Sequence, residues 1–440
     1  MNRLVRSFVV TMSAILVLAL ASCSAGGGKV TLTVWDTGLL GKTLEDGKPD
    51  MAKSFLDQAA ADFTKENPNI EVKVVQQGGD ITANNAQFQA ASIAKTGPDL
   101  RVQYPGGGVL SYGSFFVDLN GKLDATTIES MTGWNTVREG YKPDGKLWAM
   151  PYGAGLYFTV FENRAMVSAA GLDPDKFPTT WEEMLANGKT IKAKTGKNGF
   201  FVADLEGYVG AWVVGGLLGG ELGETVSTDM FNGTTAVNDA AMVKVYKAWA
   251  DFGASGLTNP DGGTLTNGES TAGFVQEKGA YYIVGSWENG NMQDKFGPTK
   301  VSTFFLPMLA GAKNPTAVAG GPQVAVSITN YSKHQDEALL FLKYLARPEV
   351  QDKYVALNQT ESSNHIKGDP ALLTNSFLRT QAEQLKAMKP VVYPFDNVMP
   401  QPVIDLFYKM NAAVFLGKVT PQEAADQLEA ANKAEIANRK

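Results

Sequence analysis

The fold is decided by VTLTVWD (30–36), IEVKVV (70–75) and the run from Met51 to Lys65 between them. Both quoted segments alternate apolar and polar residues as strands do, and the intervening run spaces its apolar residues along one helix face. A strand, a helix and a strand in this order close a parallel pair through a right-handed crossover. The sequence therefore predicts an open α/β sheet.

The residues just after Val34 and Val75, at the carboxyl ends of these two strands, are candidates for a binding site. Ligands of open α/β sheets gather at the carboxyl ends of the strands. In this chain those positions hold Trp35, Asp36, Gln76 and Gln77. We expect all four at the rim of a ligand site.

Composition excludes several classes of protein. The chain has 440 residues, of which 44% are hydrophobic and 10% aromatic, so it can bury a large core and is not disordered. Its net charge of −6 argues against nucleic-acid binding. One cysteine and two histidines, His334 and His365, provide neither an internal disulfide nor a zinc-binding pattern. We expect no metal and no cofactor.

The first residues have the pattern of an export signal. Arg3 and Arg6 precede an apolar run over 8–20, and Leu-Ala-Ser-Cys23 follows. Thirteen apolar residues are fewer than the ~20 that span a bilayer, which disfavours the alternative of a transmembrane anchor. The segment around Cys23 resembles the bacterial lipobox. We therefore predict a signal peptide over 1–22, a lipidated Cys23 and a flexible tether over 23–29, which together place the chain outside the cytoplasm.

The sequence can be compared with the motifs of three kinds of enzyme. The segment over 36–43 is one residue from a phosphate-binding P-loop, but Asp36 replaces the first glycine and no helix is predicted directly after it. The chain has no Gly-x-Ser-x-Gly motif. A glycoside hydrolase needs only two carboxylates, and Asp204, Glu206 and Glu288 leave that reaction open.

An aromatic set is more informative than these motifs. Its members each sit within two residues of a glycine, a proline or an acid: Trp35, Tyr104, Tyr152, Tyr208, Trp212 and Trp287. Flat rings match the C–H face of a pyranose, and neighbouring polar side chains can bond its hydroxyls. The set favours a sugar site, with core packing as the alternative for each ring.

Proline and threonine mark helix boundaries later in the chain. Thr179 or Thr180, and Thr420, are followed by glutamate at capping-box spacing, so helices are expected to begin there. Two helices, 337–346 and 348–357, are predicted on either side of Arg347-Pro348. We expect the chain to cross between lobes at that break.

Several motifs, in their shared order, resemble the extracellular solute-binding proteins of bacterial ABC sugar importers, the family of the maltose-binding type. They are VTLTVWD (30–36), FTKENPNIEV (63–72), GKLWAMPYG (145–153), FPTTWEEM (177–184), VGSWE (284–288) and the stretch from Gly320-Gly321 to Val350. The resemblance covers nearly the whole mature chain.

This resemblance implies a two-lobed α/β fold of the periplasmic-binding-protein type, with a hinge and an interlobe ligand cleft. Lobe one is expected over 30–156 and 300–346, and lobe two over 157–299 and 347–440. The ligand-binding residues that the resemblance implies are Trp35, Asp36, Tyr104 and Tyr152 from lobe one, Glu206, Tyr208, Trp287 and Glu288 from lobe two, and Gly321, whose backbone would approach the ligand.

The function implied is capture of a sugar or oligosaccharide and its delivery to a membrane permease, without catalysis. The chain is expected to be a lipid-anchored monomer, outside the cytoplasm, that binds no nucleic acid. Two alternatives stay open: a receptor for another polar solute, such as a polyol, a peptide or a phosphorylated sugar, and a secreted glycoside hydrolase.

Overall fold

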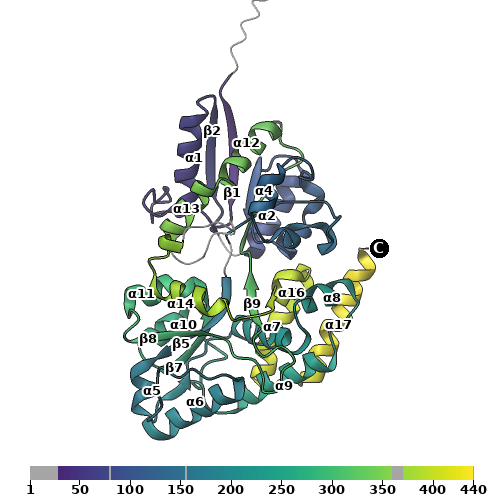
Figure 1. The fold of residues 1–440 in the computed structure, drawn as a ribbon. Coiled ribbons are helices and arrows are strands. Elements are labelled where there is room, and N and C mark those ends of the chain that lie inside the picture. The colour runs from purple at the N-terminus through teal and green to yellow at the C-terminus, as the bar shows by residue number, and fades with distance from the viewer. Residues whose placement is uncertain (1–27, 79–80, 154–155, 359–369, 440) are drawn as a thin grey trace, which may run out of the picture.

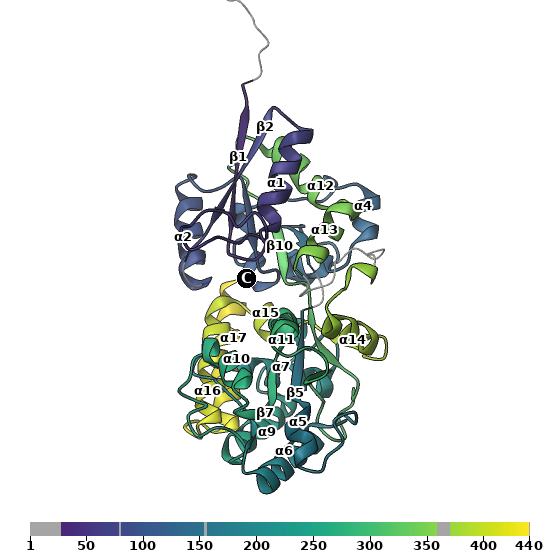
Figure 2. The ribbon, with the colours of Figure 1, turned by 90° about the vertical axis from the view of Figure 1, so that its left-hand side faces the viewer.

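The computed structural model describes residues 28–78, 81–153, 156–358 and 370–439. They form two α/β lobes, one above the other in Figure 1 and still separate in the turned view of Figure 2. Each lobe has its own sheet and its own hydrophobic core. The expected two-lobed α/β fold is confirmed. The predicted signal peptide and Cys23 lie outside the described residues.

Lobe one is a five-stranded sheet in the order β2-β1-β3-β10-β4. Its strands are β1 (Val30–Asp36), β2 (Ile70–Gln76), β3 (Leu100–Gln103), β4 (Met150–Tyr152) and β10 (Val324–Ile328). Its helices are α1 (Phe55–Glu66), α2 (Ile81–Ile93), α3 (Gly107–Leu110), α4 (Ala125–Ser130), α12 (Gln335–Leu345) and α13 (Pro348–Asn358). Short 3-10 turns lie over Gly113–Phe115, Trp134–Val137 and Glu139–Tyr141.

The strand, helix, strand unit predicted at the start of the chain is confirmed as β1, α1 and β2. The two strands pair in parallel, from Val30 opposite Ile70 to Asp36 opposite Gln76. The helix begins at Phe55 rather than Met51, because Asp50–Lys53 forms a turn and Ser54 occupies the N-cap position. Both views place α1 and α2 on opposite faces of the sheet (Figures 1 and 2).

Lobe two contains a six-stranded sheet in the order β11-β9-β5-β7-β6, with β8 paired to β5. Its strands are β5 (Leu156–Asn163), β6 (Asn198–Phe200), β7 (Gly279–Gly285), β8 (Val301–Phe305), β9 (Val318–Gly321) and β11 (Val391–Val392). Its helices are α5 (Arg164–Ala169), α6 (Trp181–Thr195), α7 (Tyr208–Leu222), α8 (Val226–Asn232), α9 (Ala240–Ala254), α10 (Asn267–Val275), α11 (Asn289–Lys295), α14 (Ser376–Leu385), α15 (Phe395–Val398), α16 (Gln401–Phe415) and α17 (Pro421–Asn438). A 3-10 turn over Ser286–Glu288 follows β7. Another 3-10 turn, over Pro370–Leu372, packs on α13 of lobe one.

The centre of lobe two is α7. Residues Val209–Glu221 are all buried, and four glycines among them let neighbouring side chains approach the helix closely. Thr420 begins α17 with the expected capping box, whereas Thr180 caps α6 through its side chain and the Glu183 carboxylate accepts from Thr179 instead. A helix that is apolar on every side must be enclosed by its domain, so α7 has a fixed position from which its first turn can present side chains.

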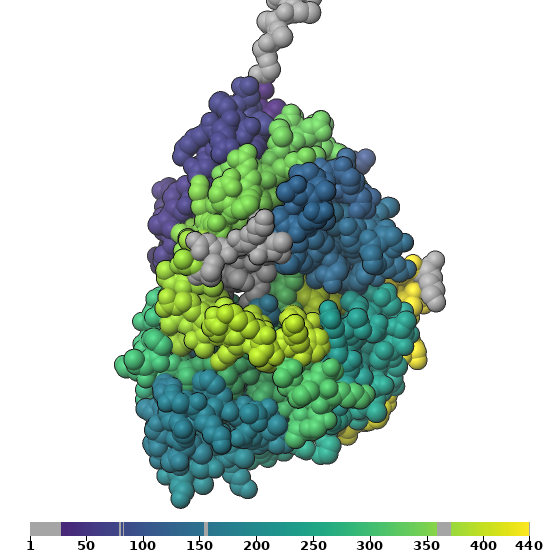
Figure 3. Space-filling model, viewed as in Figure 1, coloured from purple at the N-terminus to yellow at the C-terminus, as the bar shows by residue number. Residues whose placement is uncertain are grey.

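The two lobes are joined by strands that leave one sheet and enter the other. The chain passes from β4 to β5 at the first crossing and returns from β9 to β10 at the second. In the space-filling view the lobes meet along one transverse boundary (Figure 3).

The expected lobe limits need two corrections. Residues 301–321 belong to lobe two, because β8 pairs with β5 and β9 pairs with both β5 and β11. Residues 347–358 belong to lobe one, because α13 packs on α1. Pro348 does end α12, but it then serves as the first residue of the next helix instead of starting a crossing.

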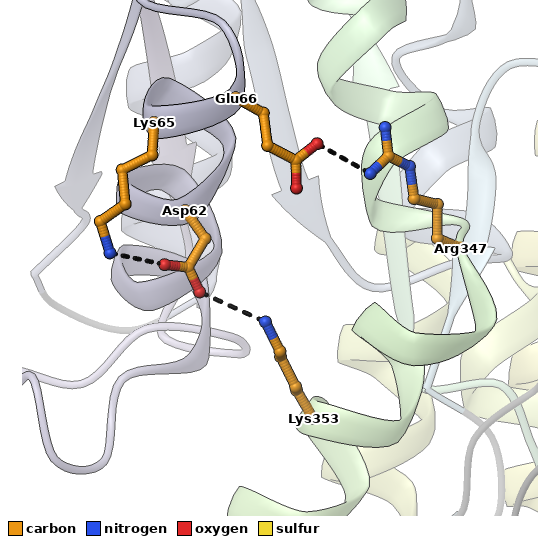
Figure 4. Close-up of polar contacts among 5 residues, drawn as sticks. All are labelled: Asp62, Lys65, Glu66, Arg347 and Lys353. Carbon is orange, nitrogen blue, oxygen red and sulfur yellow. Dashed lines mark hydrogen bonds and ion pairs between the residues drawn. The ribbon is translucent and has the colours of Figure 1, made fainter.

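Exposed ion pairs reinforce the attachment of α12 and α13 to α1 (Figure 4). Arg347 contacts Glu66 at 2.8 Å, and Lys353 contacts Asp62 at 3.4 Å. Asp62 also receives Lys65 of its own helix, and this proximity to lysines lowers the pKa of Asp62. Exposed pairs of this kind contribute at most about 1 kcal/mol each, so apolar packing holds α13 in place.

Candidate functional site

Strand directions bring three carboxyl ends of lobe one to the lobe boundary. β4 runs into the first crossing, so its carboxyl end lies at the boundary. β10 is antiparallel to both β4 and β3, and β1 is parallel to both β3 and β2. The carboxyl ends of β1, β2 and β3 must therefore face lobe two. They carry Trp35, Gln77 and Tyr104, which places these predicted rim residues on one edge.

The directions of the strands in lobe two follow in the same way from the first crossing. β5 enters from the first crossing, and β7 is antiparallel to it with Phe158 opposite Gly285. The carboxyl end of β7, which leads to Trp287, therefore faces lobe one. β6 is parallel to β7, so the segment 201–208 that follows it lies at the same edge. The two lobes thus present their predicted site residues toward each other.

Two groups of rings lie along this edge of lobe two, the trio Phe158, Trp287 and Trp212 and the pair Tyr208 and Tyr408, and we call the five rings together the aromatic strip. Trp287 packs on Trp212 with ring centroids 4.9 Å apart and meets Phe158 edge-on at 6.5 Å. Tyr208 and Tyr408 are edge-to-face at 4.9 Å. Tyr208 and Trp212 are four residues apart on α7, so they share a helix face. Trp287, Tyr208 and Tyr408 remain partly exposed.

Carboxyl groups lie beside the aromatic strip. Glu206 accepts a hydrogen bond from the backbone N–H of Asn267 at 3.0 Å, at the start of α10. Glu288 accepts from Asn291 at 3.0 Å. Asp396 of α15 is buried and accepts from the hydroxyl of Tyr408 at 3.1 Å. Because an ionised carboxylate only accepts hydrogen bonds, these groups suit a ligand that donates them.

Asp204 fixes the first turn of α7. Its Oδ1 accepts the backbone N–H groups of Val209 and Gly210, at 2.8 and 3.2 Å. Burial raises the pKa of Asp204 to about 7, with a further rise from the nearby Glu206, although the two N–H donors act in the opposite direction. The carboxyl group therefore holds a helix end in position and titrates near neutral pH.

We predict that Asp204→Asn changes how stability depends on pH. The folded pKa of about 7 lies above the value of about 3.9 in an unfolded chain. The stabilising contribution of this group is therefore lost as pH rises from about 4 through about 7. Asparagine keeps an oxygen for α7 and does not titrate. In urea unfolding, the variant should gain stability relative to the unmodified chain between pH 5 and pH 8, and an equal difference at both pH values would contradict the prediction.

Lobe one contributes an aromatic ring and amides to the opposite wall. Trp35 is partly exposed and packs on the lobe-one core. The side-chain oxygens Gln77 Oε1 and Asn84 Oδ1 are buried and have no hydrogen-bond partner among the described residues. Amides both donate and accept, which complements the acceptor groups of lobe two.

Direct contacts across the boundary also tie the lobes together. The hydroxyl of Tyr141 donates to the carbonyl oxygen of Val398 at 2.7 Å, and its ring meets Phe231 edge-on at 4.9 Å. A cavity of about 520 Å³ lies next to this contact, lined by Trp148 and Lys142 from lobe one and by Phe231 and Arg439 from lobe two, among others. It is lined by none of the strip residues.

Three predicted site residues have structural surroundings instead. Tyr152 is 0% exposed, and its ring stacks on Phe55 in the lobe-one core at 5.8 Å. Asp36 is also 0% exposed, and its carboxylate accepts backbone N–H groups from the loop after β1, including Gly41 at 2.6 Å. We correct both assignments, because neither side chain is accessible. At Gly321 the approaching group is the ring of Tyr393.

Two important residues were not predicted from the sequence, Tyr408 and Asp396. Tyr408 stands in the middle of α16, where a tyrosine looks like an ordinary core residue. Asp396 follows Tyr393-Pro394-Phe395, where an aromatic residue stands directly before a proline, as Tyr104 does before Pro105. That signal was available and was missed. Among the described residues, no group of three potential metal ligands was found, and no helix is long and apolar enough to cross a membrane.

Comparison with known proteins agrees with this geometry. Residues 58–362 match the family model of bacterial extracellular solute-binding proteins. The chain is 25% identical to the multiple sugar-binding protein of Streptococcus mutans over 315 residues, 68% of this chain and 69% of the relative. It is 22% identical to the sn-glycerol-3-phosphate-binding periplasmic protein of Yersinia pseudotuberculosis over 402 residues, 84% and 86% of the two chains.

Solved structures confirm the fold. A chitin oligosaccharide binding protein superposes with a TM-score of 0.78 at 18% identity, over 93% of this chain and 99% of that one. At this identity the likeness speaks for the two-lobed architecture, and ligand chemistry has to be argued from the residues of this chain.

Proposed function

Since this chain belongs to the bacterial extracellular solute-binding protein family and so works outside the cytoplasm, we propose that it captures a neutral sugar or short oligosaccharide between its lobes and passes it to an ABC permease. Its ligand would contact Trp35 and Tyr104 on one side and Tyr208 and Trp287 on the other. Binding energy gained only when both walls touch the ligand favours the closed arrangement. The chain itself carries out no reaction.

The observation that carries the proposal is the aromatic strip with acids beside it and no cation. Stacked rings bind the apolar face of a sugar, and acceptor groups bind its hydroxyls. The segments that build this edge, 201–212, 285–290 and 393–408, contain no lysine, arginine or histidine. A phosphorylated ligand, as in the Yersinia relative's name, would meet uncompensated negative charge there.

Thermal-shift screening against a carbohydrate panel tests the function directly. A ligand present at 100 times its Kd should stabilise the purified chain by about 2.7 kcal/mol. The panel should include maltotriose, xylotriose, chitotriose and raffinose, with sn-glycerol 3-phosphate as the charged comparison. Stabilisation by a neutral sugar supports the proposal. New reducing ends after incubation would instead indicate a glycoside hydrolase.

Anchoring through Cys23 is a separate part of the proposal. A lipid-modified Cys23 with two or more acyl chains would hold the chain stably at the membrane. We predict that Cys23→Ser releases the chain into the soluble fraction, while Ser24→Ala leaves it in the membrane fraction. Fractionation followed by immunoblotting measures this, and membrane retention of Cys23→Ser would exclude the lipobox.

A further inference from the structure

The pair formed by Tyr408 and Asp396 has a defined hydrogen-bond direction. The phenol oxygen of Tyr408 lies 3.1 Å from Asp396 Oδ2. Burial raises the pKa of Asp396 to about 6, so this carboxyl group is mainly ionised at neutral pH. Burial and the adjacent carboxylate raise the pKa of Tyr408 well above its usual value, so the phenol stays protonated. The tyrosine therefore donates its one hydrogen to the aspartate.

A phenol that has given its hydrogen to one partner keeps its oxygen lone pairs for another. Its oxygen can then only accept. A free tyrosine, by contrast, can rotate its hydroxyl to donate to a ligand. The hydrogen bond to Asp396 prevents this rotation. Asp396 is only 7% exposed, so its carboxylate is held in place by the residues packed around it.

The position of Tyr408 makes this restriction relevant to binding. Its ring is edge-to-face with Tyr208 at the end of the aromatic strip. Tyr104 of lobe one is close enough to contribute to the raised pKa of Tyr408. The phenol of Tyr408 therefore lies near the lobe boundary, beside Tyr208 of lobe two and within electrostatic range of Tyr104 of lobe one.

We propose that Tyr408, held by Asp396, is a specificity-determining residue that accepts a hydrogen bond from a ligand hydroxyl and disfavours a phosphate group at the same position. The inference rests on the proposed function and narrows it. A sugar hydroxyl donates to Tyr408 and can accept from the amides of Gln77 or Asn84. A phosphate dianion has no hydrogen to give to Tyr408, and it faces the negative charge of Asp396 behind it.

The test compares two classes of probe in calorimetry. The sugar found by the panel is the neutral probe, and sn-glycerol 3-phosphate is the charged one. Tyr408→Phe removes the acceptor oxygen and should lower the affinity for the neutral sugar at least fivefold. Asp396→Asn removes the charge and offers an amide that can donate to the phenol oxygen, which frees the phenol hydrogen for the ligand. The ratio of sugar affinity to phosphate affinity should then fall at least fivefold.

Two controls separate the outcomes. Tyr344→Phe removes a phenol from α12 in lobe one, far from the boundary, and should leave both affinities unchanged. If the unmodified chain binds no neutral sugar, the proposed function fails. If it binds one but both variants keep affinities and ratio within twofold, the role of Tyr408 and Asp396 is refuted while the function stands. Tighter binding of sn-glycerol 3-phosphate than of every sugar by the unmodified chain would also refute it.

Discussion

Replacing Trp287 with alanine should lower the affinity for the neutral sugar at least tenfold, about 1.4 kcal/mol, and leave the fold intact. Trp287 combines partial exposure at the lobe boundary with a fixed ring orientation, because Trp212 supports one side of the indole at 4.9 Å. A large aromatic ring offers about 150–250 Å² of contact surface. Alanine removes nearly all of it from the ligand.

The matched control is Phe177→Ala. Phe177 is also partly buried in lobe two, where it stacks on Phe304 at 5.1 Å. It precedes α6, and that helix lies at the end of lobe two opposite the boundary (Figure 1). Calorimetry should show unchanged affinity for this variant and circular dichroism should show that both variants are folded. Equal affinity of Trp287→Ala and the unmodified chain would remove Trp287 from the site.

The sequence was sufficient for the fold because local patterns and chain order agree. Alternation in 30–34 and 70–74 and the helix between them correspond to β1, α1 and β2 in parallel register. The predicted lobe limit at Arg347-Pro348 was wrong, because the proline breaks the helix there without marking a crossing of the chain between lobes. Whether a helix after a break packs back on the same lobe depends on its partner, here α1, and no local pattern reveals that partner.

Site residues were harder to predict, for a physical reason. Trp35 and Tyr152 both stand at the ends of strands and have similar neighbours in the sequence, yet one is partly exposed and the other is fully buried between Phe55 and Tyr354. A strand has two faces, and which face is covered depends on helices distant in sequence. Tyr408 shows the opposite case, a residue that looks like core in the sequence and lies at the boundary in the structure. Its position follows from the packing of α16 on α7.

Gly207, the N-cap residue of α7, lies against α16. Its replacement by alanine should lower the stability of lobe two more than most single substitutions. Its φ is +81°, and a Cβ there would collide with the backbone carbonyl of Tyr408. Proline would be excluded here as well, because it fixes φ near −65°. We expect Gly207→Ala to cost about 3 kcal/mol or more, since two strains add: an unfavourable φ and a backbone clash.

Gly196→Ala separates these two strains. Gly196 ends α6 with φ +70°, and nothing lies within 4 Å of its would-be Cβ. Its replacement should cost only the conformational strain, about 1 kcal/mol. Urea unfolding followed by tryptophan fluorescence measures both variants. Gly207→Ala should in addition weaken sugar binding, because relief of the clash must move Tyr408 or the first turn of α7. Equal losses of stability in the two variants would mean that α7 and α16 can separate without cost, and the aromatic strip would then lack the fixed support that its role in binding requires.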